Sequence, residues 1–379
     1  MTATPLTDVA QRLLRHVQHE SGDLAEQVMR VPVTAYSDPD AYEREIAEIF
    51  RKVPLVVCLS ADLREPGDLF AIDLVERPIV CVRGKDGVAR TFLNACRHRG
   101  AKVACNGFGH ERRLACPYHA WVYDTDGALI GVPQRDQFGE IDVTGLIELP
   151  TEERSGIVFA VLTPGATMDL DAWLGDMAGA LEALDLANVH RYEQTTTLES
   201  GNWKSTADGY LDGYHVSYLH RANIGQRTMS GRNTYDLYGP HVRIGFANHP
   251  IKAMADQPVE EWDLVEAMSL VHYLFPNISI SGQASRSTMM SRIVPGPTPD
   301  RSTVIQYHYR RDPIDSEAKR TEMETRRKLY AAVTGDEDFA TVLGINDTVP
   351  ALDGHTDFLF GRNEPANQNL HTWVAKLTT

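Results

Sequence analysis

The chain has 379 residues, of which 42% are hydrophobic and 23% are charged, and its formal net charge is −15 at pH 7. These fractions are ordinary for a globular protein, and the length suggests two domains that each bury a core. The excess of acidic residues argues against a nucleic-acid partner. No apolar run is long enough to cross a membrane, and the N-terminal residues do not have the pattern of a signal peptide, so we expect neither.

The first predicted elements are two helices. Apolar residues recur at helical spacing at Val9, Leu13, Leu14 and Val17, which predicts an amphipathic helix. A second helix is predicted from Asp38-Pro39-Asp40 to Phe50, because proline and acidic residues are favoured in the first turn.

Short β-type runs separated by turn residues begin at Pro54 and end near Gly165. The turns are Gly-Lys-Asp-Gly at 84–87 and Asp-Thr-Asp-Gly at 124–127, the second within a hairpin over 123–130. The predicted runs are 55–59, 69–75, 79–82 and 90–94. This pattern predicts an all-β module.

Two metal-binding loops lie inside this module. Cys96-Arg97-His98 is followed after seventeen residues by Cys116-Pro117-Tyr118-His119, so each loop offers one thiolate and one imidazole. In a Rieske [2Fe–2S] centre two cysteines hold one iron and two histidines hold the other. We therefore predict a Rieske cluster with Cys96, His98, Cys116 and His119 as ligands.

The alternative is a zinc site with the same four ligands, in an interaction protein. Zinc fingers usually pair cysteine with cysteine and histidine with histidine, whereas each loop here mixes the two. Of the remaining cysteines, Cys58 and Cys81 lie in apolar runs and are expected to be buried thiols, while Cys105 lies between the loops. We therefore expect no disulfide framework.

Helices and strands alternate after the β module. A helix is predicted over 169–186 and another over 315–333, with strands over 192–198, 242–248 and 304–310. Neither internal repeats nor low-complexity segments interrupt this part of the sequence.

A second metal site is predicted between residues 202 and 220. His215 and His220 are separated by four residues and are preceded by Asp208 and Asp212. Two histidines and one carboxylate form the facial triad of mononuclear iron sites, which leaves positions open for O2. Because a Rieske cluster only transfers electrons, such a site would carry the chemistry.

The spacing within this segment departs from helix geometry. On an ideal helix Asp208, Asp212 and His215 share one face, but His220 lies about 140° around the axis from His215. Either the helix is bulged, or His220 lies beyond its end. Gly209 and Gly213 also weaken a helix here, which favours a functional site over a scaffold.

From about residue 38 to residue 373, the chain resembles the terminal oxygenase (alpha) subunit of Rieske non-heme iron oxygenases of the aromatic-ring-hydroxylating type. The motifs that carry the resemblance are Cys-Arg-His-Arg-Gly, Cys-Pro-Tyr-His-Ala-Trp, Asn-Trp-Lys, Asp-Gly-Tyr-His with a second histidine five residues on, and Phe-Gly-Arg-Asn-Glu-Pro at 360–365. The resemblance implies an α+β fold. It consists of N-terminal helices in 1–53 packing on the catalytic domain, a β-rich Rieske domain in 54–165, and a helix-grip (START-like) catalytic domain with an antiparallel sheet in 166–379.

The resemblance also implies roles for single residues. Asp212 matches a carboxylate that bridges the cluster of one subunit and the iron of its neighbour, so a homotrimer is expected, with or without a separate β subunit. Asp212 and Asp208 are the candidate catalytic residues. Asp338 is the candidate third iron ligand, although Asn346 stands eight residues later where the family has glutamine, and Asp336 is the rival.

The potential of the cluster and the source of its electrons are implied in the same way. Ala101 and Tyr118 stand where respiratory Rieske proteins carry extra cysteines, so the cluster is of the low-potential type. Such a labile cluster and the lack of an export signal point to the cytoplasm. Electrons are expected from NAD(P)H through a separate ferredoxin or flavin reductase, because the chain has no Gly-x-Gly-x-x-Gly fingerprint.

The implied reaction is mono- or dioxygenation of an aromatic or other apolar small molecule. O- or N-dealkylation by a monooxygenase is an alternative, and a non-catalytic Rieske electron-transfer protein is another. A local excess of positive charge surrounds the first cluster loop, where an acidic donor would dock. Its members are Arg97, Arg99, Lys102, Arg112 and Arg113, with Glu111 the one acid among them.

Overall fold

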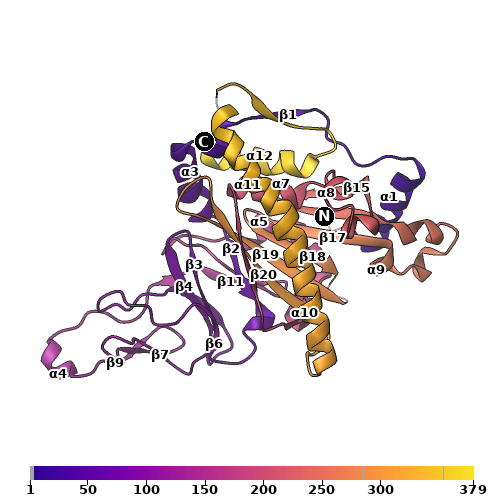
Figure 1. Cartoon of the computed structure of the whole chain (residues 1–379). Coiled ribbons are helices and arrows are strands. Elements are labelled where there is room, and N and C mark those ends of the chain that lie inside the picture. Colours follow the sequence, from indigo (N-terminus) through magenta and orange to yellow (C-terminus); the bar gives the residue numbers. More distant parts are fainter. Residues whose placement is uncertain (1–3, 284–285, 353) are drawn as a thin grey trace. The chain divides into compact units, whose positions relative to one another are not determined.

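The computed structural model describes residues 4–283, 286–352 and 354–379, which form two compact units (Figure 1). The smaller unit consists of Phe50–Trp173 and Asp185–Asn188, and the larger unit of the N-terminal residues up to Ile49, Leu174–Leu184 and Val189–Thr379. In the described part of the chain, no helix combines the length and apolarity that crossing a membrane requires.

The smaller unit is built from three antiparallel sheets. Their strand orders are β10-β5-β4-β3-β6, β11-β12-β2 and β7-β8-β9. The strands are β2 (Leu55–Leu59), β3 (Asp68–Leu74), β4 (Arg77–Arg83), β5 (Ala89–Leu93), β6 (Gly107–His110), β7 (Leu114–Ala115), β8 (Val122–Tyr123), β9 (Leu129–Gly131), β10 (Glu148–Leu149), β11 (Thr151–Arg154) and β12 (Ile157–Ala160). The four predicted β runs are therefore confirmed.

One boundary of these runs differs from the prediction. The run predicted to end at Val75 ends at Leu74, which pairs with Arg77. Val75 and Glu76 form the two-residue turn between β3 and β4, with φ angles of 42° and 62°. Such turns usually carry asparagine or glycine, so the sequence gives no signal for this one.

The core of the smaller unit lies under the two predicted cluster loops. Apolar side chains of β3, β4 and β5, such as Val80 and Phe92, pack against Trp121 and against Cys96 and Cys116. Cys58 and Cys81 are buried as expected, and Cys105 is exposed.

The larger unit contains an eight-stranded antiparallel sheet. Its order is β13-β20-β19-β18-β17-β16-β15, with β14 also paired to β20. The strands are β13 (His190–Arg191), β14 (Thr196–Ser200), β15 (Thr228–Tyr238), β16 (His241–Asn248), β17 (Met268–Leu274), β18 (Ile278–Gln283), β19 (Ser287–Pro295) and β20 (Ser302–Arg310), while β1 (Met29–Pro32) pairs with β21 (Asp357–Phe360) in a separate ribbon.

The two faces of this sheet have different neighbours. On β16, Gly245 and Ala247 lie against α1, and a Cβ atom at Gly245 would come within 3.0 Å of Val9. Phe246, which points to the opposite face, lines a cavity. Alternation along the strand thus separates a packed face from the face that carries the candidate site.

The helices connect and cover these sheets (Figure 1). They are α1 (Leu6–Gln18), α2 (Thr34–Ser37), α3 (Pro39–Arg44), the π-helix η1 (Glu45–Phe50), η2 (Ser60–Asp62), α4 (Arg135–Phe138), α5 (Leu170–Leu174), α6 (Met177–Glu182), η3 (Leu186–Asn188), α7 (Trp203–Leu211), α8 (Val216–Leu219), η4 (Ile224–Gln226), η5 (His249–Met254), η6 (Val259–Glu261), α9 (Leu264–Ala267), α10 (Glu317–Ala332), the π-helix η7 (Val333–Phe339), α11 (Ala340–Leu352) and α12 (Pro365–Thr378).

The predicted helices are confirmed near both ends of the chain but not in the middle. Asp38 caps α3 by accepting a hydrogen bond from the Asp40 backbone N–H. The single helix predicted over 169–186 is wrong, because the chain adopts a left-handed conformation at Gly175 (φ 49°) and forms α5 and α6 instead. The strand predicted over 192–198 is also wrong in part, since β14 begins only at Thr196.

A buried ion pair anchors the start of α7. Lys204 Nζ donates to both carboxylate oxygens of Glu45 at 2.6 Å, and Trp203 Nε1 donates to the same group at 2.7 Å. The side chains of Lys204 and Glu45 are 1% and 4% exposed. The Asn-Trp-Lys motif therefore fixes α7 from its first turn, with Asn202 as the capping residue.

We expect Glu45→Gln to lower the free energy of unfolding by about 3–5 kcal/mol, because it leaves a buried ammonium without its counter-charge. Chemical denaturation measures this loss. Asp315→Asn is the control, since Asp315 pairs with Lys319 on the surface and its loss is expected to leave the stability nearly unchanged. Equal stability of the Glu45→Gln variant and the unchanged protein would contradict the assigned role.

Candidate metal centres

His215 and His220 lie at the two ends of one short helical turn. Helix α7 ends at Leu211, Asp212 is extended (φ −88°, ψ 120°), and α8 spans only Val216–Leu219. His215 immediately precedes α8 and His220 immediately follows it. Of the two alternatives, a bulged helix or a His220 beyond the helix end, the structure has the second, whereas the single helical face expected for Asp208, Asp212 and His215 is wrong.

Gly213 lies in the break between the two helices. A Cβ atom at this position would lie 2.8 Å from the side chain of Asn233 on β15, so only glycine fits. The break lets the chain turn, and both imidazoles then face the same point.

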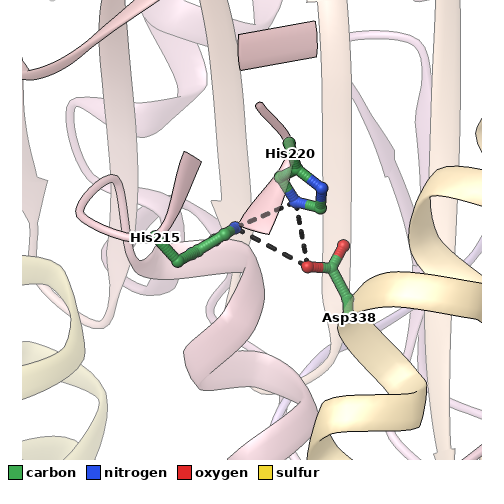
Figure 2. A group of neighbouring side chains, drawn as sticks. All are labelled: His215, His220 and Asp338. Carbon is green, nitrogen blue, oxygen red and sulfur yellow. Dashed lines mark hydrogen bonds and ion pairs between the residues drawn. The ribbon is translucent and has the colours of Figure 1, made fainter. Parts of the chain in front are cut away.

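Asp338 completes a group of three with these histidines (Figure 2). The two Nε2 atoms are 3.2 Å apart, and Asp338 Oδ1 lies 3.0 Å from His220 Nε2 and 3.6 Å from His215 Nε2. Asp336, the rival candidate, is exposed and outside this group.

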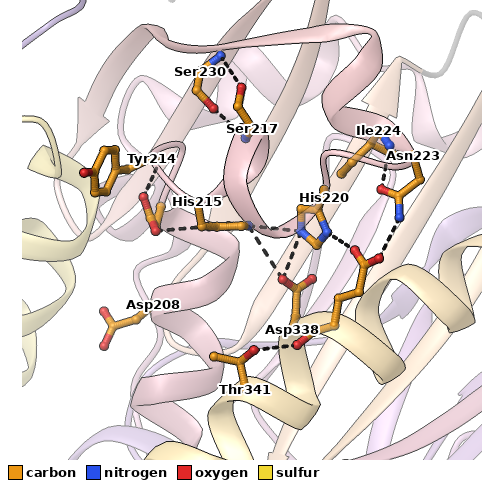
Figure 3. A network of polar contacts seen from close by, with 12 residues as sticks. Asp208, Tyr214, His215, Ser217, His220, Asn223, Ile224, Ser230, Asp338 and Thr341 are labelled. Carbon is orange, nitrogen blue, oxygen red and sulfur yellow. Dashed lines mark hydrogen bonds and ion pairs between the residues drawn. The ribbon is translucent and has the colours of Figure 1, made fainter.

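The outer nitrogen of each imidazole is held by a second carboxylate (Figure 3). Asp212 Oδ2 lies 3.0 Å from His215 Nδ1, and Glu337 Oε2 lies 2.5 Å from His220 Nδ1. Asn223 Nδ2 donates in turn to Glu337 Oε1 at 2.9 Å. Carboxylates in this position fix the tautomer with the proton on Nδ1 and leave a lone pair on Nε2.

The geometry of the three inner atoms fits a metal ion. Two imidazole nitrogens and one carboxylate oxygen converge at 3.0–3.6 Å, an arrangement that can hold a cation between them. Ligands about 2.1 Å from a metal and at right angles are separated by about 3.0 Å. Burial alone would lower the pKa of His220, but the carboxylates of Asp338 and Glu337 outweigh it and raise the pKa.

A π-helix supplies both acids at His220. Helix α10 continues through η7 into α11, and Glu337 and Asp338 lie in η7. These consecutive residues reach opposite nitrogens of one imidazole. π-Bulges of this kind are frequent at functional sites. The sequence analysis missed Glu337, although its position next to Asp338 was a signal.

Asn346, which departs from the family pattern, has a local partner. It lies on α11, donates to the Asp300 carbonyl at 2.5 Å and accepts from the Asn202 backbone N–H at 3.3 Å. It therefore ties α11 to the N-terminus of α7.

Asp208 faces a different set of residues. Its carboxylate accepts from Tyr36 Oη at 3.0 Å and lies 3.1 Å from His371 Nε2 and from Asn367 Nδ2. In Figure 3 its side chain is turned away from the three ligand candidates. Sequence reasoning missed these partners, which come from both ends of the chain.

Cavities reach the group of three from two sides. One, of about 190 Å³, is lined by His215, His220 and Asp338 together with apolar side chains, among them Phe246 and Met289. The other is also about 190 Å³ and contains Asp208, Asp212 and Glu364. Burial raises the pKa of Glu364, and the neighbouring carboxylates Asp212 and Asp208 raise it further.

We expect Asp212→Asn to slow turnover about 10–100-fold while the metal content stays largely unchanged, the usual effect of replacing an outer hydrogen-bond partner of a ligand. Steady-state rates and metal analysis measure the two quantities. Ser217→Ala on the neighbouring α8 is the control and is expected to have full activity. An Asp212→Asn variant with the unchanged rate would remove Asp212 from the catalytic machinery.

The two loops of the smaller unit share one backbone conformation. The N–H of Cys96 donates to the Ala101 carbonyl, and the N–H of Cys116 donates to the Trp121 carbonyl, each at 2.8 Å. Four residues after each cysteine, Gly100 and Ala120 donate back to it, with φ angles of 77° and 54°. The loops are thus two copies of one ligand-bearing turn.

The side chains of these loops fit a two-iron cluster better than one zinc ion. The His98 and His119 ring centroids are 4.6 Å apart, both cysteines are buried, and the buried His98 Nδ1 has no hydrogen-bond partner in the described residues. Four ligands of one ion would lie close together. Among the described residues, however, the ligand-atom group within 4.8 Å is that of His215, His220 and Asp338.

Tyr123 is a further residue at this site that sequence reasoning missed. Its hydroxyl lies 3.3 Å from Cys96 Sγ and accepts a hydrogen bond from the Arg97 backbone N–H at 2.9 Å. Its own proton is therefore available to the sulfur. Hydrogen bonds to the sulfurs are among the factors that set the potential of an iron–sulfur cluster.

Comparisons with known proteins agree with this fold. The Rieske [2Fe-2S] domain matches residues 53–150, and the catalytic domain of the ring hydroxylating alpha subunit matches residues 186–379. These domains define a Rieske non-heme iron oxygenase subunit. The chain belongs to the ring-hydroxylating alpha subunits, and its cofactors are accordingly a Rieske [2Fe–2S] cluster and a mononuclear iron.

Individual relatives differ in what they act on. The chain is 31% identical over 198 residues to the carnitine monooxygenase oxygenase subunit of Escherichia coli, covering 52% of this chain and 53% of that protein. It is 33% identical over 203 residues to the benzene 1,2-dioxygenase alpha subunit of Pseudomonas putida, covering 50% and 44%. The chain thus spans about half the length of these curated relatives.

Solved structures match over the whole chain. A quaternary ammonium Rieske monooxygenase superposes with a TM-score of 0.80 at 19% identity, covering 100% of both chains. Naphthalene 1,2-dioxygenase from Rhodococcus superposes with a TM-score of 0.71 at 19% identity, covering 100% of this chain and 99% of that one. These likenesses establish the fold.

Proposed function

We propose that this chain is a terminal oxygenase component that hydroxylates an aromatic or other apolar small molecule with O2 and electrons from a separate reductase. The observation that carries the proposal is the group of His215, His220 and Asp338, which opens onto an apolar cavity. Electrons would enter through the Rieske domain in residues 54–165, and the reaction would take place in the catalytic domain in residues 166–379. The N-terminal helices in residues 1–53 would belong with the catalytic domain.

The ligand assignments form part of the proposal. Cys96, His98, Cys116 and His119 would hold the cluster, and His215, His220 and Asp338 would hold the iron. One-electron transfer and O2 activation at a site with open positions are the chemistry that these groups supply when bound.

The protein residues have three tasks in this scheme. Asp212 and Glu337 keep the proton of each imidazole on Nδ1, so that both Nε2 atoms face the metal position. The apolar wall of the cavity places the substrate and excludes water. Asp212 would also accept a contact from the neighbouring subunit's cluster domain, and a homotrimer is the assembly that this arrangement needs.

Product analysis tests the proposal. The protein with a surrogate ferredoxin and reductase is given NADH, O2 and single-ring and two-ring aromatic compounds such as benzene, toluene and naphthalene. We expect a hydroxylated or dihydroxylated product whose formation requires both O2 and the reductase. If none of these aromatic compounds is oxidised although the cluster is reduced and reoxidised, the proposal that the chain hydroxylates such compounds is wrong.

A second candidate function is oxygenation next to a quaternary nitrogen. Relatives named as carnitine and glycine betaine monooxygenases favour it, and three aromatic residues, Tyr210, Phe246 and Tyr330, line the cavity. Aromatic faces attract quaternary ammonium groups. Carnitine and glycine betaine in the same panel distinguish the two functions, since dealkylated products from these compounds alone would favour the second.

Metal content separates the oxygenase from the two remaining alternatives. The oxygenase holds three irons per chain, two in the cluster and one at the triad. An electron-transfer protein of the Rieske type would hold only the two of the cluster, and a zinc protein would be colourless.

The proposed electron donor is an acidic ferredoxin or reductase. Arg97, Arg99, Lys102, Arg112 and Arg113 are all exposed in the smaller unit. Lys102 is neutralised by Asp73 at 2.6 Å, which leaves the arginines as the main positive charges. Two of them, Arg112 and Arg113, line one surface cavity together with Lys85 and His110.

We expect Arg112→Glu to raise the apparent KM for the donor about tenfold at low salt without changing the KM for the organic substrate, because surface charges act mainly on association rate. Donor titrations at two ionic strengths measure the effect, which should shrink as salt increases. Arg301→Glu, an exposed change in the larger unit, is the control. Donor kinetics indifferent to both Arg112→Glu and salt would place the docking surface elsewhere.

A further inference from the structure

The inner cavity at the triad has room for about one aromatic ring. Its volume of about 190 Å³ is close to that of an apolar protein cavity of about 150 Å³ that holds benzene. Among the described residues its wall contains no lysine or arginine. A charged group on the substrate therefore finds no cationic partner next to the metal position.

This inner cavity adjoins a larger outer cavity of about 710 Å³. The two share the wall residues Ile224, Thr228, Ser269, Gly282 and Tyr330. A substrate larger than one ring can therefore extend from the triad past these residues toward the outer cavity.

The outer cavity carries an excess of positive charge. Arg227, Arg286 and Arg326 line it, with Glu322 as the one acid among the described wall residues. Glu322 is already paired with Arg310 outside the cavity wall, at 3.1 Å.

The three arginines are not balanced by their neighbours. Arg227 and Arg286 share the single carboxylate of Glu266, at 3.1 and 3.2 Å. Arg326 lies half-buried on α10 and has no ion-pair partner in the described part of the chain. At least one guanidinium at the mouth of the substrate cavity is thus available to an anion, and guanidinium groups bind carboxylates and sulfonates with paired hydrogen bonds.

We propose that the substrate has an apolar end of about one ring, which enters the inner cavity, and an anionic end, a carboxylate or sulfonate, which Arg326 binds in the outer cavity with help from Arg227 and Arg286. This inference rests on the proposed function, since it takes the triad cavity as the substrate site. It adds the requirement that the substrate carry a negative charge at a distance from the carbon that reacts.

Ligand binding tests the proposal without turnover. The probes are two matched series of phenylalkyl compounds, from phenylacetate to 6-phenylhexanoate and the corresponding carboxamides, and calorimetry on the full-length, metal-loaded protein measures their affinities. Because the chain length sets the reach from the inner cavity to Arg326, the preference for carboxylate should appear at one range of lengths. We expect the best carboxylate to bind at least about tenfold more tightly than its amide at low salt, a ratio that falls as salt is added.

Two variants test whether the outer cavity causes the preference for carboxylates over amides. Arg326→Gln should reduce the ratio to near one, while Arg320→Gln should preserve it, because Arg320 lies on the same helix but pairs with Glu193 on the surface. Equal binding of acids and amides to the unchanged protein, no binding of any acid, or a ratio that survives Arg326→Gln would each overturn the proposal. Product analysis of the same mixtures is read separately, so an acid that binds without being oxidised counts against the oxygenase function and not against the anion site.

Discussion

Replacing His220 by alanine should remove the mononuclear iron and reduce product formation by more than about 100-fold, while the optical and EPR signals of the cluster remain. The effect is large because Nε2 of His220 is one of the three atoms that converge on the metal position, and Nδ1 is held by Glu337. His215→Ala should have the same effect, because His215 Nε2 is another of these three atoms and lies 3.2 Å from His220 Nε2. Metal analysis, EPR and product yield measure the three quantities.

His249→Ala is the control for these variants, because His249 is an exposed histidine in the same unit. It should retain three irons and full activity. If the His215→Ala and His220→Ala variants both keep three irons, the group of three does not bind the metal.

Replacing His98 by cysteine should lower the reduction potential of the cluster by several hundred millivolts or abolish the cluster. Imidazole ligands place Rieske centres at about −150 to +300 mV, whereas plant-type clusters with four cysteines lie near about −400 mV. The unpartnered Nδ1 of His98, buried against the stacked ring of Trp121, is the atom that the change removes. EPR and a redox titration measure the result.

The matched control is Cys105→Ser. Cys105 lies between the loops but is exposed, so this variant should keep the spectrum and the potential. A His98→Cys variant with the spectrum and potential of the unchanged protein would remove His98 from the cluster. The mononuclear iron should be present in both variants.

The sequence predicted the strands of the smaller unit because these depend on local patterns, and local patterns also gave the candidate ligands other than Asp338. Turn residues bounded the strands of the smaller unit, and fixed spacings marked Cys96, His98, Cys116 and His119. The turn at Val75 and Glu76 was not predictable, because neither residue usually adopts its positive φ.

The geometry around the triad depended on contacts distant in sequence. At the break after α7, Asn233 from β15 leaves no room for a side chain at position 213. Glu337 contacts His220 from within the π-helix η7, and no propensity in Val333–Phe339 signals that geometry. The spacing of His215 and His220 does not fit one face of a single helix. It is explained by α8, the single turn that the two residues flank.

The most direct test of the oxygenase proposal is a single turnover with isotopically labelled O2. The protein is reduced in the absence of air, the reductase is removed, and an aromatic compound that gives product in steady state is added together with the labelled gas. The proposal predicts a hydroxylated product that carries one or two labelled oxygen atoms from O2. Product labelled only from water, or a protein that is oxidised without forming product, would contradict it.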